Sequence, residues 1–135
     1  MNMKVKDITA VRESFAPLSI QENWDNSGLI IGSPEQEVHG ILLGFDCTAG
    51  LVDEAVECGA DMIVTHHPLI FGGIKKISPE DPVGLAVLKA AAAGIAVYAA
   101  HTTADKVLGG VSGAMARRLE LKDIRILDEE PGGYG

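Results

Sequence analysis

Aromatic residues and long apolar runs are scarce in this sequence. Its 135 residues include three Phe, two Tyr and one Trp, so small aliphatic residues supply most of an apolar share of 47%. Side chains of this kind pack well between helices and a sheet, which favours an α/β fold. No stretch approaches the ~20 apolar residues that a membrane-spanning helix needs, so we expect no membrane partner.

Cysteine is also rare. Cys47 and Cys58 are too few for a disulfide scaffold, and they are typical of reduced thiols. Residues 1–6 contain two lysines with no apolar segment behind them, so we expect no secretory signal. Together these features predict a cytoplasmic protein.

Basic residues are outnumbered. The chain has 19 acidic and 11 basic residues, for a net charge of −8. A field of that sign repels phosphate backbones and attracts cations, so we expect no nucleic-acid partner. The length suits one domain with its own core, and we predict a single α/β domain over residues 1–135.

Apolar runs of strand length alternate with helical patterns. Thr48 is a candidate N-cap and Gly59 a helix end, while Asp81 and Pro82 form an N-cap and first-position pair. Continuous apolar strands alternating with helices predict a mainly parallel sheet covered by helices on both faces. We expect parallel neighbouring strands, joined by right-handed crossovers, near 40–46, 61–66 and 95–101, with helices near 49–58 and 82–93 between them.

Weaker patterns flank this central part. Asp7 is a candidate N-cap for a first helix that Pro17 ends. We expect a short strand at 29–31, a helix at about 110–119 and a last strand at 124–127.

Residues suited to chemistry follow the three central strands. Asp46 ends the first strand, His66 and His67 end the second, and His101 ends the third, with Asp105 close behind. Ligands of open parallel sheets bind beyond the carboxyl ends of the strands. The sequence therefore predicts a functional site at that edge of the sheet.

The pair His66-His67 has two interpretations. One histidine could be buried and hydrogen-bonded while the other is exposed. Alternatively each imidazole holds one of two metal ions, because adjacent residues leaving a strand point in roughly opposite directions and one ion rarely takes both. Pro68 would stiffen the turn. Neutral imidazole suits divalent zinc, iron, manganese or nickel.

Asp105 and His101 also have alternatives. Asp105 could cap the following helix, but the neighbouring histidine pair favours metal ligation, in which its carboxylate bridges two cations. His101 is either a ligand or a catalytic group that moves protons beside the substrate.

The remaining polar candidates are less specific. Asp46 caps a helix, supports a metal ligand or contacts substrate, and Cys47 is a buried thiol rather than a ligand. Trp24 is expected in the core, with Asp25 and Asn26 forming turn hydrogen bonds, although all three are also candidate walls of the site. His39 precedes a strand start and is expected at the surface.

Four motifs carry a family resemblance. They are Trp24-Asp25-Asn26-Ser27-Gly28-Leu29, Phe45-Asp46-x-Thr48, His66-His67-Pro68-Leu69-Ile70-Phe71 and Ala100-His101-Thr102-x-x-Asp105. The chain resembles the YbgI-like dinuclear metal-centre proteins, the GTP cyclohydrolase 1 type 2 homologues. The resemblance implies His66, His67 and Asp105 as metal ligands, an α/β fold, ring-like homo-oligomers and a metal-dependent hydrolase.

One part of the family pattern is missing. The family completes its two-metal site with a His-x-x-x-Glu motif near the carboxyl terminus, and no histidine follows His101 here. We interpret the chain as the amino-terminal part of a longer family chain, in preference to a short relative that has lost part of the site. In either case we expect partial or no metal occupancy unless metal is supplied. The expected function is hydrolysis of a nucleotide or related heterocycle. The alternative is a non-catalytic metal-binding scaffold or partner-interaction module.

Overall fold

Three apolar strands form the parallel centre of one sheet. In the computed structural model, which describes residues 2–135, these are β4 (Ile41–Gly44), β5 (Met62–Thr65) and β6 (Ala96–Ala99). The sheet order is β2-β6-β5-β4, with β4, β5 and β6 parallel and β2 (Gly28–Ile31) antiparallel to β6. The predicted α/β class, the three parallel neighbours and the strand near residue 29 are confirmed.

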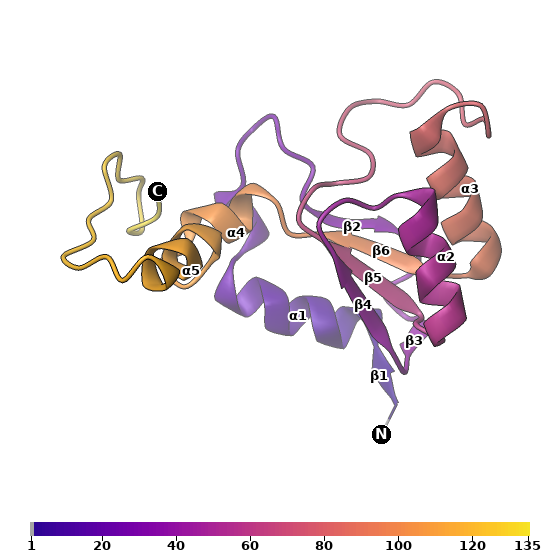
Figure 1. Cartoon of the computed structure of the whole chain (residues 1–135), viewed down its shortest axis with the longest axis horizontal. Helices are drawn as coiled ribbons and strands as arrows, with labels where there is room; N and C mark the ends of the chain where they lie inside the picture. Colours follow the sequence, from indigo (N-terminus) through magenta and orange to yellow (C-terminus); the bar gives the residue numbers. More distant parts are fainter. Residues whose placement is uncertain (1) are drawn as a thin grey trace.

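Two helices cover one face of this sheet (Figure 1). α2 (Ala49–Cys58) begins where the Thr48 hydroxyl accepts a hydrogen bond from the Leu51 N–H at 3.1 Å. α3 (Pro82–Ala93) begins where the Asp81 carboxylate accepts from the Gly84 N–H at 2.7 Å. Both helices end at a left-handed glycine, and their bounds match the predicted ones.

The other face is covered by α1 (Val5–Phe15). Val5 packs with Met62 and Tyr98 of the sheet, and the Tyr98 hydroxyl donates a hydrogen bond to Glu13 at 3.2 Å. Alternate residues of β5 therefore point to opposite faces, since Ile63 belongs to the cluster under α2 and α3. Helices on both faces are as predicted.

The start of α1 corrects one prediction. Asp7 is not the N-cap but the third residue of the helix, where its carboxylate accepts a hydrogen bond from the Lys4 N–H at 2.9 Å. A carboxylate is favourable anywhere in the first helical turn, so the local pattern did not separate the two positions. Pro17 follows the end of the helix, as expected.

Three segments of two or three residues were not predicted. β1 (Met3–Lys4) pairs with β3 (Glu37–Val38) as a separate antiparallel ribbon, and η1 (Leu18–Ile20) is one turn of 3₁₀ helix. Segments of two or three residues are too short to show a period in the sequence.

The carboxyl-terminal part extends to one side of the sheet in Figure 1. It contains α4 (Thr102–Lys106) and α5 (Val111–Arg118), the latter as predicted. The strand expected at 124–127 is wrong, because this segment lies beyond α5 without a neighbouring strand, and Leu127 is fully exposed. Among the helices of residues 2–135, none has the length and apolarity needed to cross a membrane.

A buried glycine fixes the loop that follows β5. A Cβ atom on Gly84 would overlap the carbonyl oxygen of Ser78 and lie 2.8 Å from its nitrogen, so α3 and the end of loop 68–78 fit only without a side chain. We expect Gly84→Ala to lower the free energy of unfolding by about 1–3 kcal/mol through overpacking. The matched control is Gly50→Ala in the first turn of α2, where the nearest atom is 3.7 Å away.

The control should be neutral or raise stability by up to about 1 kcal/mol, because alanine favours a helix more than glycine does. Urea unfolding of both variants measures the difference. Equal stability of the two variants would contradict the tight contact between Gly84 and Ser78.

Candidate metal centre

Three histidines converge where β5 and β6 end. One ring nitrogen of each of His66, His67 and His101 lies within 4.8 Å of the others. The ring centroids of His66 and His67 are 5.0 Å apart. The centroid of His101 lies 5.2 Å from that of His66 and 5.3 Å from that of His67. Parallel pairing of β5 and β6 brings the two strand ends to one edge, so the side chains predicted to form a site there do lie together.

The chain turns immediately after β5. The Thr65 hydroxyl donates a hydrogen bond to the carbonyl of His67 at 2.8 Å, and the His67 N–H donates to the carbonyl of Phe45 at 3.1 Å. Strand alternation would have pointed His66 and His67 in opposite directions. Because the turn ends that alternation, both imidazoles face the same small volume.

Asp46 orients His67. Its carboxylate lies 2.7 Å from Nδ1 of His67, while Thr48 caps α2. Of the roles left open for Asp46, the structure therefore favours support of a histidine over capping of a helix. With Nδ1 donating to Asp46, Nε2 of His67 keeps a free lone pair, which is the form that binds metals.

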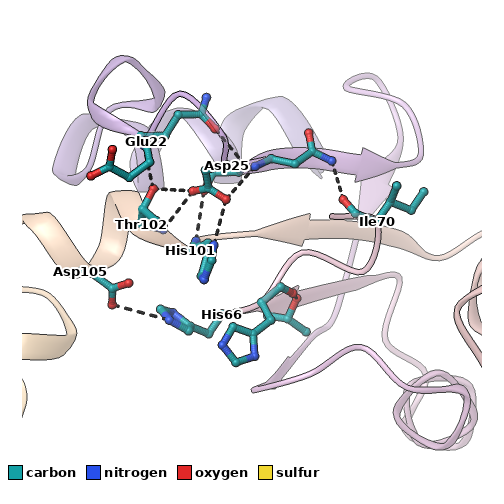
Figure 2. A network of polar contacts seen from close by, with 12 residues as sticks. Glu22, Asp25, His66, Ile70, His101, Thr102 and Asp105 are labelled. Carbon is teal, nitrogen blue, oxygen red and sulfur yellow. Dashed lines mark hydrogen bonds and ion pairs between the residues drawn. The ribbon is translucent and has the colours of Figure 1, made fainter. Parts of the chain in front are cut away.

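Asp25 does the same for His101. Its Oδ1 lies 2.9 Å from Nδ1 of His101, and its side chain is completely buried. Figure 2 shows this carboxylate between Thr102 and His101, with the imidazole extending from it toward His66. Nε2 of His101 is therefore the ring nitrogen on the side away from Asp25.

Hydrogen bonds keep Asp25 ionised in this buried position. Burial alone would raise the pKa of its carboxyl group, but Thr102, His101 and Ser27 donate side-chain hydrogen bonds to it and Asn26 donates its N–H. These bonds outweigh burial and lower the pKa of Asp25 to about 2. The carboxylate is thus a fixed acceptor for the Nδ1–H of His101.

Asp105 faces His66 across a wider gap. Its Oδ1 lies 3.6 Å from Nε2 of His66, too far for a hydrogen bond. Asp105 lies inside α4, whose N-cap residue is His101, so the capping alternative for Asp105 is wrong. Two ligands with ~2 Å bonds to one tetrahedral ion lie roughly 3.3–3.5 Å apart, so this pair is close to the separation that a shared ion requires.

The donor set fits a divalent transition metal. Three neutral imidazoles and one carboxylate suit zinc and its neighbours, and the side chains of His66 and His101 are each only 16% exposed. Cys47 lies outside this group and is buried, which raises the pKa of its thiol to about 11. Its thiol is protonated at neutral pH, and Cys47 is not one of the residues that converge.

Aromatic rings surround the cluster, and one of them corrects a prediction. Trp24 is not in the core but 56% exposed, with its ring centroid 6.0 Å from His101 and 5.9 Å from Phe71. Phe45 stacks on His66 at 5.4 Å on another side. A single Trp in a chain of small aliphatic residues suggested burial. Trp24 instead lies in loop 21–27, which borders the site and does not pack into the core.

Asn26 joins two of the loops. Its Nδ2 donates a hydrogen bond to the carbonyl of Ile70 at 2.6 Å, which links the loop before β2 to the loop after β5 (Figure 2). Every candidate residue predicted from the sequence therefore lies at one site. Ser27 and Thr102, which hold Asp25, were not predicted as functional, because Thr102 lies 77 residues away from that carboxylate along the chain.

Fold and site together define a class: an α/β protein with a histidine cluster, supported by carboxylates, beyond the ends of its parallel strands. Residues 3–135 match the family model Duf34/NIF3 (NGG1p interacting factor 3). The GTP cyclohydrolase 1 type 2 homolog of Clostridium acetobutylicum is 39% identical over 127 residues, 94% of this chain. The chain belongs to the Duf34/NIF3 family, which confirms the resemblance carried by the four motifs.

Solved structures agree with this assignment. The crystal structure of Staphylococcus aureus hypothetical protein SA1388 is 37% identical, with a TM-score of 0.91 over 96% of this chain and 37% of that one. Reduced HcgD from Methanocaldococcus jannaschii is 28% identical, with a TM-score of 0.86 over 95% of this chain and 51% of that one. The chain spans 47% of the Clostridium acetobutylicum relative, and its place as the amino-terminal part of a longer chain stays a prediction.

The buried carboxylate of Asp25 gives a pH-dependent stability. Its pKa is lowered from 3.8 to about 2. The ionised carboxylate therefore contributes fully to the free energy of unfolding above pH 3.8, and this contribution is lost as the pH falls toward 2. We expect Asp25→Asn to be less stable than the wild type at pH 7, with a difference that shrinks over that acid range. Urea unfolding at a series of pH values measures this difference.

Asp46→Asn is the matched control, because the Asp46 side chain is 60% exposed and its hydrogen bond to His67 is open to solvent. Its effect on stability at pH 7 should be much smaller. If both variants unfold like the wild type at pH 7, the hydrogen-bonded carboxylate of Asp25 does not stabilise the fold.

Proposed function

We propose that this chain carries the metal site of a metal-dependent hydrolase that acts on a nucleotide or a related heterocycle. The observation that supports it best is the convergence of three imidazoles, two of which have Nδ1 held by a carboxylate. The printed names of the curated relatives, GTP cyclohydrolase 1 type 2 homologues, support the substrate class.

In this proposal His66, His67 and Asp105 hold the metal. A divalent ion bound there would act as a Lewis acid. It would lower the pKa of a bound water molecule, so that hydroxide could form at neutral pH. His101 moves a proton at Nε2, because Asp25 holds its Nδ1–H and fixes the tautomer. Its closeness to the other two histidines also supports a role as a fourth ligand, and the variants below distinguish the two roles.

Metal affinity tests the ligand set. We expect His67→Ala and Asp105→Ala each to weaken zinc or manganese binding at least about tenfold, or about 1.4 kcal/mol. His101→Ala should weaken it comparably only if His101 is a ligand. Isothermal titration calorimetry measures all of these, and affinity should fall in acid, because a protonated imidazole cannot bind a metal.

His39→Ala is the matched control for these substitutions. His39 is the fourth histidine, its side chain is 68% exposed, and it pairs with Asp61 just before β4, away from the site. Its replacement should leave metal affinity unchanged. Equal affinity in the wild type and in every variant would exclude these residues as ligands.

Turnover tests the reaction. With metal supplied, we expect the protein to hydrolyse a purine nucleotide, and we expect a chelator to abolish this activity. In His101→Ala, kcat should fall about 10²- to 10⁴-fold while metal affinity is retained. Chromatography of the reaction products measures turnover, and His39→Ala again serves as control. Metal binding without turnover in the 135-residue chain would instead support the alternative of a non-catalytic scaffold or partner-interaction module.

The ligand count bears on how many ions the chain would hold. Three imidazoles and one carboxylate are enough for one tetrahedral ion, whereas two ions shared between them would each be poorly coordinated, so metal occupancy would depend on the supply of metal.

Assembly and location are also part of the proposal. Leu43 on the edge strand β4 is 73% exposed, and Phe45 just after this strand is 63% exposed. Apolar surface of this kind favours association into a homo-oligomer. Both cysteines are free, which supports a cytoplasmic location.

A further inference from the structure

Trp24 and Phe71 form an aromatic platform beside the histidine cluster. Their side chains are 56% and 53% exposed, and their ring centroids lie 5.9 Å apart. Both rings meet His101 edge-on, at 6.0 and 6.1 Å. The hydrogen bond from Asn26 to Ile70 joins the two loops that carry them. The two ring planes are tilted by 52°, so a flat ligand on this platform stacks on one ring while its edge meets the other, beside the proposed metal site.

The neighbouring loop adds positive charge. A cavity of about 530 Å³ is lined mostly by residues of loop 68–78, among them Phe71, Lys75 and Lys76, and also by Asp81, whose carboxylate caps α3. No ion pair involves either lysine within residues 2–135. In a protein with a net charge of −8, two adjacent unpaired ammonium groups form a local site for an anion.

Phe71 belongs to both features, so the ring surface and the positive charge are contiguous. We propose that the site binds a nucleoside monophosphate, with its planar base on the Trp24–Phe71 platform and its phosphate at Lys75 and Lys76. This inference rests on the proposed function and specifies how that site recognises its substrate. Any nucleic-acid base can stack on an exposed aromatic ring, and lysine ammonium groups bind phosphate as point charges.

The arrangement discriminates between ligand classes. A free planar ring would occupy the platform and leave the lysines unpaired, whereas a sugar phosphate would pair with the lysines and leave the aromatic surface in water. A long polynucleotide would meet the negative field of the rest of the protein. A small ligand with one ring and one phosphate satisfies both features.

Trp24 is the only tryptophan, so its fluorescence reports directly on the platform. The metal-free protein is titrated with guanosine monophosphate, guanosine and ribose 5-phosphate. We expect both ring-containing ligands to quench Trp24 and ribose 5-phosphate not to. Guanosine monophosphate should bind more tightly than guanosine, and this advantage should decrease as ionic strength rises.

Two variants separate the two features. Phe71→Leu removes the second ring and should weaken both ring-containing ligands by roughly 5- to 100-fold, as expected for the loss of one stacking contact. Phe15→Leu is its control, because Phe15 is 52% exposed on α1 and should have no effect. Lys75→Gln/Lys76→Gln should reduce the affinity for guanosine monophosphate to that for guanosine.

The control for charge is Arg118→Gln/Lys122→Gln, which removes two exposed positive charges at and after the end of α5. It should leave the preference for the monophosphate intact. All four replaced side chains in the two double variants are exposed, so each variant should keep the far-UV circular dichroism of the wild type.

The outcomes distinguish this inference from the proposed function. No quenching by any ligand, or equal affinities in Phe71→Leu and Phe15→Leu, would overturn the inference even if metal binding and hydrolysis are found. Ring and phosphate binding without turnover would support the inference while the hydrolase proposal fails. Loss of the monophosphate preference in the Arg118 and Lys122 control would show that net charge, not the lysine pair, attracts the phosphate, and would also overturn it.

Discussion

Backbone hydrogen bonds between β4, β5 and β6 set the positions of Asp46, the histidine pair and His101. Gly44 lies opposite Thr65, and Thr65 lies opposite Ala99, so the three strands end in step at one edge. Asp46, the histidine pair and His101 follow these ends within two residues. A shift of register by one residue would move these side chains to the other face of the sheet and separate the cluster.

Carboxylates define what the histidines can do. Asp46 and Asp25 occupy Nδ1 of His67 and His101, and Asp105 faces Nε2 of His66. Each imidazole is thus paired with a negative charge that favours a nearby cation. The two hydrogen-bonded pairs differ in burial: Asp46 is 60% exposed, whereas Asp25 is fully buried and held by five donor groups. His101 is therefore held more firmly than His67 is.

The same negative charge creates a problem for an anionic substrate. A cluster supported by three carboxylates, in a protein of net charge −8, attracts metal ions and repels phosphate. Lys75 and Lys76 on loop 68–78 add positive charge in the cavity that Phe71 and Asp81 also line, and they have no ion-pair partners in the described part of the chain. The end of this loop is fixed where Ser78 contacts Gly84.

The sequence by itself determined the parallel strands, the caps at Thr48 and Asp81, and the histidines at the strand ends. These features are local, since periodicity and capping depend on residues within a few positions of one another. The position of Asp7 in the first turn and the absence of a strand at 124–127 were missed, because a weak local pattern fits more than one structure.

Only the tertiary structure decided which loop lies beside which strand end. Asp25 reaches His101 across 76 residues, and Asn26 reaches Ile70 across 44. These contacts made Trp24 a wall of the site instead of a core residue and made Asp46 a partner of His67 instead of a helix cap. The contacts of loop 21–27 have a long-range physical cause. This loop leads into β2, and β2 is placed beside β6 only when the sheet assembles.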